Sequence, residues 1–385
     1  MLKIKKKNVS KIYNLPKDVK FCTNCVVSNQ RPRVSFNKDN LCNACVNIRN
    51  KSKINWFDRE KKLKELLSKY RKKNGQFDVI VPSSGGKDSA IVAHKLKYEY
   101  NMNPLTVTWA PHVYTDIGWK NFQGLINSGL SNILGTPDAK VHRRLTRDSL
   151  IQVGDPFQPF IYGQVSFPVK MALKFDVKLI MDGENAEVEY GGDNNSSTKS
   201  FSQKDEKKFW FSDFEAKKWL KNGYTKNEMD IYLSPSADQI FSKKINRQFW
   251  SYYNPWHPHE HIYYASKNTG FKPNPDGRSE GTFTKYSSLD DATDGFHFYF
   301  MLLKFGFGRA TSDAANEVRE KRISREDAVK FVQKYDEEFP IKFYKKFLEY
   351  CYISEEEFIK ICDSWRSSHI WTKKNNKWKL RKQVN

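Results

Sequence analysis

The chain has 385 residues, of which 38% are hydrophobic and 15% aromatic, enough to bury a large core in one to three domains. It contains no apolar run of roughly 18 residues or more, which excludes a transmembrane helix on length. The N-terminus is basic but lacks an apolar stretch, so we expect no secretory signal, no membrane partner and a cytoplasmic location. The net charge of +22 suits binding of nucleic acid or steering of small anionic ligands, but a lysine-rich solvated surface explains it equally well.

Four of the six cysteines lie within residues 1–50, which we interpret as a separate module. Cys22 and Cys25 form one Cys-x-x-Cys pair, and Cys42 and Cys45 form a second pair. Two such pairs place four thiolates around one tetrahedral ion and leave no open position, so the spacing predicts a structural zinc site. An iron–sulfur cluster also uses four thiolates, and the spacing does not exclude it.

Residues 51–75 are predicted to form a charged amphipathic linking helix. The apolar stripe of this helix consists of Trp56, Phe57, Leu63, Leu66 and Leu67. Short apolar runs of strand type follow at residues 77–81, 104–109 and 177–181, with a helix over residues 89–100. Strands that alternate with helices indicate an α/β fold with a parallel sheet, whose ligands lie at the carboxyl ends of the strands.

The second half of the chain is predicted to be more varied. Residues 193–230 are polar and are interpreted as an insertion or mobile lid of a domain that spans residues 76–310. His257, His259 and His261 alternate along an aromatic-rich segment, but no carboxylate or cysteine stands at ligand spacing, so we do not favour a metal site.

A helical C-terminal region is predicted for residues 311–385. Capped amphipathic helices are expected at residues 312–319, 324–335 and 354–365, and the basic last dozen residues are expected to be frayed. Cys351 and Cys362 are expected in the core, because free cysteine is commonly buried.

A glycine turn, residues 82–89 with the sequence PSSGGKDS, follows the first strand and opens a helix. Two glycines allow the backbone to approach a ligand closely, and the start of a helix offers free N–H groups to phosphate. The turn is not a Walker A loop, because Lys87 is followed by Asp88 instead of Ser or Thr and the first glycine of that motif is missing. It also lacks the dinucleotide pattern G-x-G-x-x-G.

The turn resembles the SGGxDS signature of the PP-loop ATP pyrophosphatases, whose fold is of the adenine nucleotide alpha hydrolase type. The matching residues, in order, are Ser84, Gly85, Gly86, Asp88 and Ser89. The resemblance implies that the loop holds the pyrophosphate end of ATP and that the α-phosphate is transferred as AMP to a substrate oxygen.

Further segments are similar to the N-acetyl sugar amidotransferases of surface-glycan biosynthesis, such as O-antigen (lipopolysaccharide) or flagellin glycans. They are the cysteine module and residues 106–111, 118–121, 183–192 and 304–309, in an order that covers about residues 20–340. The resemblance implies conversion of a sugar acetamido group to an acetamidino group. Adenylation turns the amide oxygen into a leaving group, ammonia attacks the adenylated imidate, and AMP and pyrophosphate are released.

The resemblance also implies roles for individual residues. Backbone N–H groups from Gly85 to Ser89, with the hydroxyls of Ser84 and Ser89, would hold pyrophosphate bridged by Mg²⁺. Lys87 would neutralise charge, and Asp88 would order the loop or the metal. The end of the second strand, at Thr108 and Trp109, would face the adenosine.

Two further pairs of residues have alternative interpretations. Gly183 and Glu184 end the third apolar run, where Glu184 would guide metal or ammonia, although a solvated acidic loop is the alternative. Lys304 and Arg309 would bind a phosphate or carboxylate on the sugar, or belong to the surface.

The source of the nitrogen is expected to be a separate protein. A glutaminase needs a cysteine at a strand–helix elbow or at the N-terminus, and the sequence offers neither. We therefore expect ammonia from a partner glutaminase, as the resemblance implies, of the imidazole-glycerol-phosphate-synthase type. The acceptor would be an N-acetylated sugar, either nucleotide-linked or a nonulosonic acid.

Two other functions remain open. A tRNA-modifying PP-loop enzyme, of the thiolase or lysidine type, would suit the charge and the zinc module, although no catalytic cysteine pair exists outside that module. A nucleotide-sensing protein without catalysis would use the loop only to bind AMP or ATP. We favour the sugar enzyme and do not expect a nucleic-acid partner.

Overall fold

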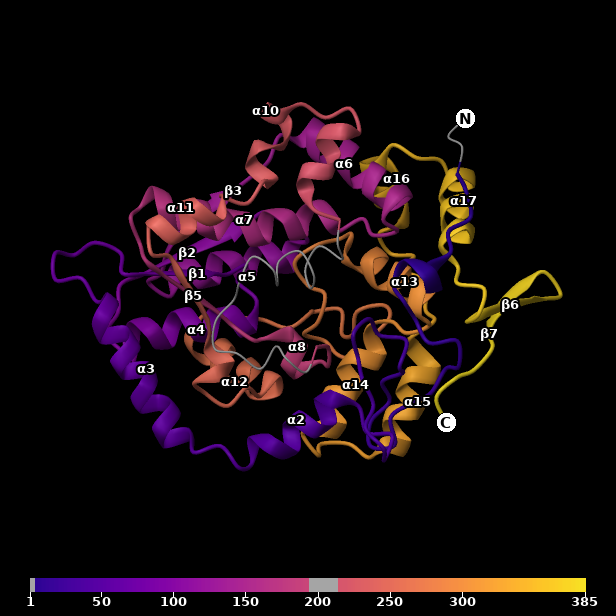
Figure 1. Cartoon of the computed structure of the whole chain (residues 1–385), viewed down its shortest axis with the longest axis horizontal. Helices are drawn as coiled ribbons and strands as arrows, with labels where there is room; N and C mark the ends of the chain where they lie inside the picture. Colours follow the sequence, from indigo (N-terminus) through magenta and orange to yellow (C-terminus); the bar gives the residue numbers. More distant parts are fainter. Residues whose placement is uncertain (1–3, 194–213) are drawn as a thin grey trace.

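Five parallel strands form the central sheet of the protein (Figure 1). The structure is a computed structural model, which describes residues 4–193 and 214–385. The strands are β1 Val79–Pro82, β2 Pro104–Trp109, β3 Ser131–Gly135, β4 Leu179–Asp182 and β5 Asn246–Phe249. Their order is β3-β2-β1-β4-β5, so the chain runs outward from β1 on one side and from β4 on the other. The carboxyl ends of β1 and β4 therefore border the crevice in which such sheets bind ligands.

The sheet confirms the predicted α/β class. The apolar runs at residues 77–81, 104–109 and 177–181 correspond to β1, β2 and β4. All the pairings in this sheet are parallel, with Val79 opposite both Pro104 and Leu179.

Different helices cover the two faces of the sheet. Ile80 and Ile180 point into the core shared with α6 and α7, whereas Val79 and Val81 point into the core shared with α3 and α4. This alternation follows from the two-residue period of a strand. On the second face, α12 packs along α4. The helices around the sheet are α3 Trp56–Tyr70, α4 Lys87–Tyr98, α5 Asp116–Asn127, α6 Ala139–Gln152, α7 Gln158–Lys174 and α12 Pro258–Asn268.

The predicted linking helix is α3, and its stripe is confirmed only in part. Leu63 and Leu67 are fully buried against the sheet. Phe57 is 76% exposed, because it lies on the face of the helix that carries the Glu60–Lys64 ion pair. The inclusion of Phe57 in the apolar stripe was wrong, since one residue along a helix turns a side chain to a different face.

The segment predicted as a polar insertion joins the core where it is described. Its residues 194–213 lie outside the described ranges. Trp219 and Met229 are buried in the same cluster as Tyr162 of α7, so the expectation of a lid outside the core is wrong for residues 214–230. The short elements from the end of β4 to α12 are α8 Ala186–Glu189, η3 Ala216–Lys221, α10 Lys226–Met229, η4 Asp230–Tyr232, α11 Ala237–Ser242 and η5 Trp250–Tyr252.

The C-terminal region is helical, as predicted. Ser324 and Ser354 cap α15 and α17 by accepting hydrogen bonds from the backbone N–H groups of Asp327 and Glu357. Cys351 and Cys362 are buried, which confirms their expected place in the core. The helices are α13 Asp294–Phe305, α14 Arg309–Arg319, α15 Arg325–Tyr335, α16 Tyr344–Cys351 and α17 Glu355–Trp365.

The basic tail is ordered, so the expectation of fraying is wrong. Strands β6 Trp371–Lys374 and β7 Lys377–Leu380 form an antiparallel hairpin, the yellow ribbon of Figure 1. The turn places Asn375 and Asn376 at φ of 49° and 59°, a left-handed pair that suits a two-residue hairpin loop. Val384 is buried in the core of the cysteine module.

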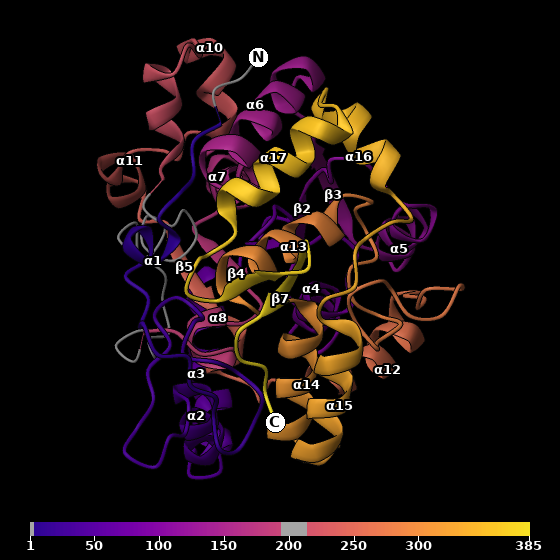
Figure 2. The ribbon, with the colours of Figure 1, turned by 90° about the vertical axis from the view of Figure 1, so that its right-hand side faces the viewer.

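The cysteine module packs against the C-terminal helices. It contains α1 Val9–Ile12 and α2 Asn43–Lys51. Cys25 shares a buried cluster with Ala314 of α14 and Val329 of α15. Figure 2 shows α2, α14 and α15 together at the lower end of the molecule. The first 50 residues and the C-terminal helices, far apart in sequence, therefore build one core between them.

Candidate active site

The glycine loop, residues 83–89, leaves the end of β1 and enters α4. Gly85 adopts φ of +91°, a conformation that side chains disfavour. A Cβ atom at Gly85 would lie 2.7 Å from the backbone N and Cα of Phe122 in α5. Only glycine therefore allows the loop to rest against α5 at this point.

Hydrogen bonds fix the base of the glycine loop. The hydroxyl oxygens of Ser83 and Ser89 lie 2.9 Å apart, and Ser89 Oγ donates to the carbonyl of Gly86. Thr108 donates its hydroxyl to the carbonyl of Ser83 and accepts from Asn132. Thr108 is 1% exposed and therefore supports the loop from behind, while its expected contact with adenosine stays a prediction.

Asp88 is held between two basic side chains. Lys87 forms an ion pair with Asp88 Oδ2, and His261 Nδ1 of α12 lies 2.7 Å from Asp88 Oδ1. Burial opposes ionisation of Asp88, but Lys87 and His261 outweigh it and hold the pKa of this carboxyl below its usual range. His261 is itself buried, at right angles to Trp256. The negative charge of Asp88 is thus fixed at the start of α4.

One cavity, here called the strand-end cavity, lies at the carboxyl ends of β1, β2 and β4. It has a volume of 270 Å³, and its walls include Ser84, Trp109, Gly183 and Glu184. Arg247 of β5 closes it through a bidentate ion pair with Asp182, at 2.6 and 2.9 Å. This is the switch point of the sheet, where a ligand site is expected.

A second cavity, here called the lateral cavity, also borders the glycine loop and has a volume of 420 Å³. The two cavities share Ser84, Gly86, Asp88 and Gln164 in their walls. Its other walls combine aromatic rings with charged groups. They include Phe157, Phe160, Tyr286, Asp290, Asp294, His297 and Arg309.

Two carboxyl groups at these cavities are weak acids. Burial, followed by the charge of Asp88, raises the pKa of Glu184 to about 7. Burial, followed by Asp294 and Asp291, raises the pKa of Asp290 to about 6. Shifts of this size are common at functional sites, because they place proton transfer near neutral pH.

The segment after β4, residues 184–192, is held by the cysteine module. Arg33 forms a bidentate ion pair with Glu187, at 3.0 and 2.7 Å. Lys51 pairs with Glu189. Arg31 Nε donates to the carbonyl of Gly191 at 3.1 Å. Because Glu184 begins this segment, the module braces one wall of the strand-end cavity.

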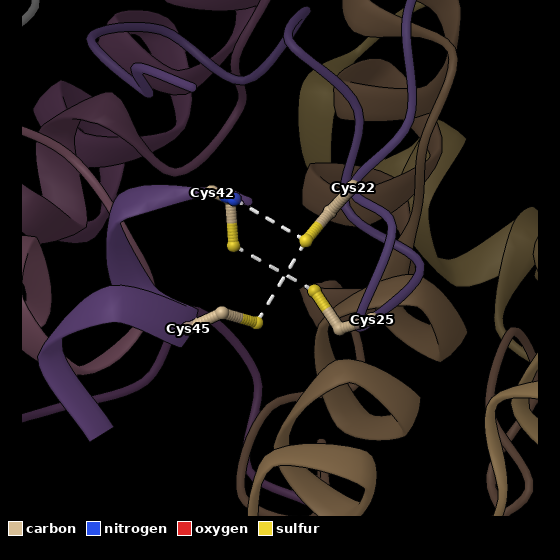
Figure 3. A group of neighbouring side chains, drawn as sticks. All are labelled: Cys22, Cys25, Cys42 and Cys45. Carbon is tan, nitrogen blue, oxygen red and sulfur yellow. Dashed lines mark hydrogen bonds between the residues drawn. The ribbon is translucent and has the colours of Figure 1, made fainter. Parts of the chain in front are cut away.

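The four sulfur atoms of the module converge on one point (Figure 3). Cys22 and Cys45 place their sulfurs 3.8 Å apart, and Cys25 and Cys42 place theirs 3.7 Å apart. Zn–S bonds of about 2.3 Å at tetrahedral angles require a sulfur–sulfur separation of about 3.8 Å. The geometry therefore fits a single tetrahedral ion, whereas an iron–sulfur cluster would have to fit several atoms between the thiolates.

Polar groups around the cluster support its sulfur atoms. The backbone N–H of Cys42 donates to Cys22 Sγ at 3.2 Å, and Asn24 Nδ2 donates to Cys45 Sγ at 3.3 Å. Arg319 of α14 lies 3.9 Å from Cys25 Sγ and can offset negative charge on the thiolates. Across residues 4–193 and 214–385, no other group of three histidine, cysteine or acidic side chains converges in this way.

The alternating histidines contact different acidic partners. His257 Nδ1 lies 2.7 Å from Glu320, and His261 contacts Asp88. Of the two basic residues proposed for the sugar, Arg309 lines the lateral cavity. Lys304 is buried beside the rings of Tyr13 and Trp365 instead.

The C-terminal part of the chain matches a known family. A family model described as LPS biosynthesis protein WbpG-like, C-terminal domain, matches residues 280–385. The C-terminal region is similar to this family over residues 280–385. The matched residues run from before α13 to beyond β7 and include Arg309. The match supports the resemblance of the sequence to a family of surface-glycan biosynthesis.

Two further proteins are similar to the chain, one in part of its sequence and one in structure. An uncharacterized protein of Methanocaldococcus jannaschii is 30% identical over 87 residues, which are 22% of this chain and 31% of that protein. The chain thus spans about a third of this curated relative. The NMN synthetase of Francisella tularensis is similar in structure with a TM-score of 0.31 and 11% identity, over 70% of this chain and 94% of that one. This score is too low to carry an argument.

None of the helices in the described ranges combines the length and apolar character needed to cross a bilayer.

The sequence analysis missed several residues that the fold brings to the site. His261, His297 and Asp290 come from segments more than a hundred residues beyond the glycine loop. No local motif marks them, and only the alternating pattern around His261 drew attention in the sequence.

Proposed function

We propose that the protein is an ATP-dependent N-acetyl sugar amidotransferase of surface-glycan biosynthesis. The observation that carries this proposal is the glycine loop, which matches SGGxDS and lines two adjoining cavities at the switch point of a parallel sheet. One cavity can hold a nucleotide and the other an acceptor, and the loop borders both. The WbpG-like match over residues 280–385 supports the assignment to glycan biosynthesis.

ATP is assigned to the strand-end cavity and the glycine loop. Trp109 and Gly183 would border the nucleoside, and the N–H groups from Gly85 to Ser89 would bind the phosphates. Mg²⁺ would offset negative charge on the phosphates, and Asp88 and Glu184 offer it oxygen ligands. In this arrangement Lys87 serves two partners, the phosphates and Asp88.

The acceptor sugar is assigned to the lateral cavity. Phe157 and Phe160 offer flat apolar faces, and Asp290 and Asp294 offer acceptors for hydroxyl groups. Arg309 adds a planar cation suited to a carboxylate or phosphate on the sugar. This combination fits either a nucleotide-linked sugar or a nonulosonic acid.

The reaction follows from the chemistry of an amide. The acetamido oxygen attacks the α-phosphorus of ATP, the bond to the β-phosphate oxygen breaks, and pyrophosphate leaves. Ammonia then adds to the imidate carbon and loses a proton. The C–O bond breaks with its electrons moving to AMP, and the acetamidino group remains.

Ammonia is proposed to come from a separate glutaminase. Both cysteines outside the metal cluster are buried, and burial raises the pKa of their thiols, so neither is an activated nucleophile. We expect the purified chain to use ammonium far better than glutamine. Equal use of glutamine would contradict the need for a partner.

The zinc ion is proposed as a structural component. Cys22, Cys25, Cys42 and Cys45 would hold it, and its bonds would fix the two loops of the module. The site lies away from the two cavities, so the ion would stabilise the module that braces residues 184–192.

The test is pyrophosphate release from Mg-ATP and ammonium with a panel of N-acetylated nucleotide sugars and nonulosonic acids. Bulk tRNA is assayed separately. We expect release with one sugar class, accompanied by a product in which NH replaces O, as seen by mass. Release with tRNA alone would overturn the proposal and favour a tRNA-modifying enzyme.

A further inference from the structure

An Asp–His pair lies at the lateral cavity, apart from the glycine loop. His297 belongs to α13, and Asp155 lies between α6 and α7. His297 Nδ1 is 2.8 Å from Asp155 Oδ1, and the same oxygen accepts a hydrogen bond from the backbone N–H of Phe157 at 2.9 Å. A carboxylate acceptor at Nδ1 selects the tautomer with its proton there, which leaves Nε2 free to accept a proton.

The surroundings of this pair are partly dry. The side chains of His297 and Asp155 are 20% and 11% exposed. The ring of Phe157 lies 5.4 Å from that of His297, measured between centroids. Such a setting orients the imidazole and limits competition from water.

The charges around His297 favour its role as a proton acceptor. Burial lowers the pKa of His297, but Asp155 and Asp294 raise it against the opposing charge of Lys304, and the pKa ends above its ordinary value. The other charged residues that line the same cavity are Lys87, Asp88, Asp290, Asp291 and Arg309. A carboxylate that raises the pKa also stabilises the imidazolium that forms when a proton arrives.

We propose that His297, oriented by Asp155, is the general base that takes the proton from ammonia as it adds to the adenylated imidate. This inference rests on the proposed function. Ammonia forms a C–N bond and becomes an ammonium group, His297 Nε2 accepts one of its protons, and AMP leaves with the C–O electrons. Asp155 acts as a positioning residue.

Other candidate bases are less suited to this step. Glu184 lines the strand-end cavity and is not among the residues that line the lateral cavity. Asp88 is already paired with Lys87 and His261. Asp290 lines the lateral cavity too, but with a pKa of about 6, raised by burial and by Asp294 and Asp291, it is a weaker base than His297, whose pKa lies above its ordinary value.

The test separates the two halves of the reaction with the full-length protein. The sugar identified from the panel is mixed with Mg-ATP, and pyrophosphate is measured in a single turnover without ammonium. The acetamidino product is then measured with ammonium. For His297→Asn we expect an unchanged pyrophosphate burst and a loss of about 100-fold or more in acetamidino formation, the usual contribution of a general base. His369→Asn, between α17 and β6 and outside the walls of both cavities, is the control and should change neither half.

For Asp155→Asn we expect an unchanged burst and a smaller loss in the ammonia step. Because Asp155 raises the pKa of His297, its removal should shift the pH profile of that step to lower pH. If Asp155 had only a structural role, Asp155→Asn would not shift the pH profile while keeping a full pyrophosphate burst.

Three outcomes would overturn the inference. Acetamidino formation near the normal rate in His297→Asn would exclude a general base there. Loss of the burst in that variant would show that His297 contacts ATP or the sugar before ammonia acts. In ¹⁵N-histidine spectra, which need no substrate, a His297 protonated at Nε2 alone would contradict the proposed orientation. No burst from the unmodified protein with any sugar would instead count against the proposed function.

Discussion

At the scale of single residues, Gly85 has the strictest requirement in the site. Gly85→Ala would place a methyl group 2.7 Å from the backbone of Phe122 and strain a φ of +91°. We expect a stability cost of about 1 to 3 kcal/mol and a fall of at least about tenfold in ATP-dependent pyrophosphate release, because the loop must shift. The measurements are urea denaturation and the pyrophosphate assay.

Gly277→Ala is the matched control for this prediction. Gly277 has a similar φ of +97°, but a Cβ atom there would meet nothing within 4 Å. Strain alone should cost this variant stability and leave pyrophosphate release unchanged. Equal losses of activity in both variants would contradict the role assigned to the close approach of loop and α5.

Glu184 gives the site a measurable pH dependence of stability. Its pKa is about 7 in the folded protein and near 4.5 when unfolded, so between these values the folded state binds the extra proton. The resulting stabilisation is complete below pH 4.5 and is lost as the pH rises through 7. In Glu184→Gln this decline should shrink by about 1 to 2 kcal/mol.

The measurement is urea denaturation of both proteins at about pH 5 and about pH 8, without nucleotide or magnesium. The pKa of Asp290 is also raised, so the free energy of unfolding of Glu184→Gln should still fall somewhat as the pH rises. An identical decline in both proteins would show that Glu184 is not a buried weak acid.

At the scale of elements, the cysteine module holds the segment after β4. Arg33→Gln would break the bidentate pair with Glu187. We expect faster hydrogen exchange at residues 184–192 and a fall in kcat of about three- to tenfold, because Glu184 would be held less firmly. Arg278→Gln is the control, since it breaks a similar pair with Glu338 outside the walls of both cavities. Equal exchange at residues 184–192 in the two variants would contradict this role of the module.

Removal of the metal should raise hydrogen exchange at residues 184–192 more than Arg33→Gln does. Chelation would separate the four thiolates and loosen both the module and the residues it grips. Hydrogen exchange should rise at residues 21–50 and 184–192, while β1 and β2 stay protected. Unchanged exchange at residues 184–192 after loss of the metal would show that the module does not brace the cavity.

The strands that could be predicted from the sequence are those with continuous apolar runs. Strands β1, β2 and β4 are buried on both faces and were predicted. Strand β5 has the sequence NRQF, in which the buried Arg247 pairs with Asp182 and the buried Gln248 accepts a hydrogen bond from Tyr253. The hairpin of β6 and β7 depends on two asparagines in the left-handed region, within a segment that composition alone describes as a charged tail.

The site was predictable only where its chemistry is local in sequence. The glycine loop and the four cysteines carry fixed spacings, and the structure gathers each set into one place. His261 and His297 reach the loop region from helices that pack onto the sheet from elsewhere. Their positions follow from tertiary contacts that no short pattern encodes.

At the scale of the whole molecule, the N-terminal module and the C-terminal helices form one support beside the central sheet. The cluster that contains Cys25 also contains Ala314 and Val384, so both ends of the chain stabilise the same core. The segment that carries Glu184 is attached to this core through Arg33 and Lys51. We therefore interpret the protein as one body in which the cysteine module braces a wall of the strand-end cavity.

The most direct test of the central claim follows the acetamido oxygen. The acceptor sugar is prepared with ¹⁸O in its acetamido carbonyl, and the products formed with Mg-ATP and ammonium are analysed by mass. If the oxygen is adenylated and displaced by ammonia, the heavy oxygen must appear in AMP and be absent from the acetamidino sugar. Heavy oxygen retained in the sugar, or found in pyrophosphate or phosphate, would contradict the account.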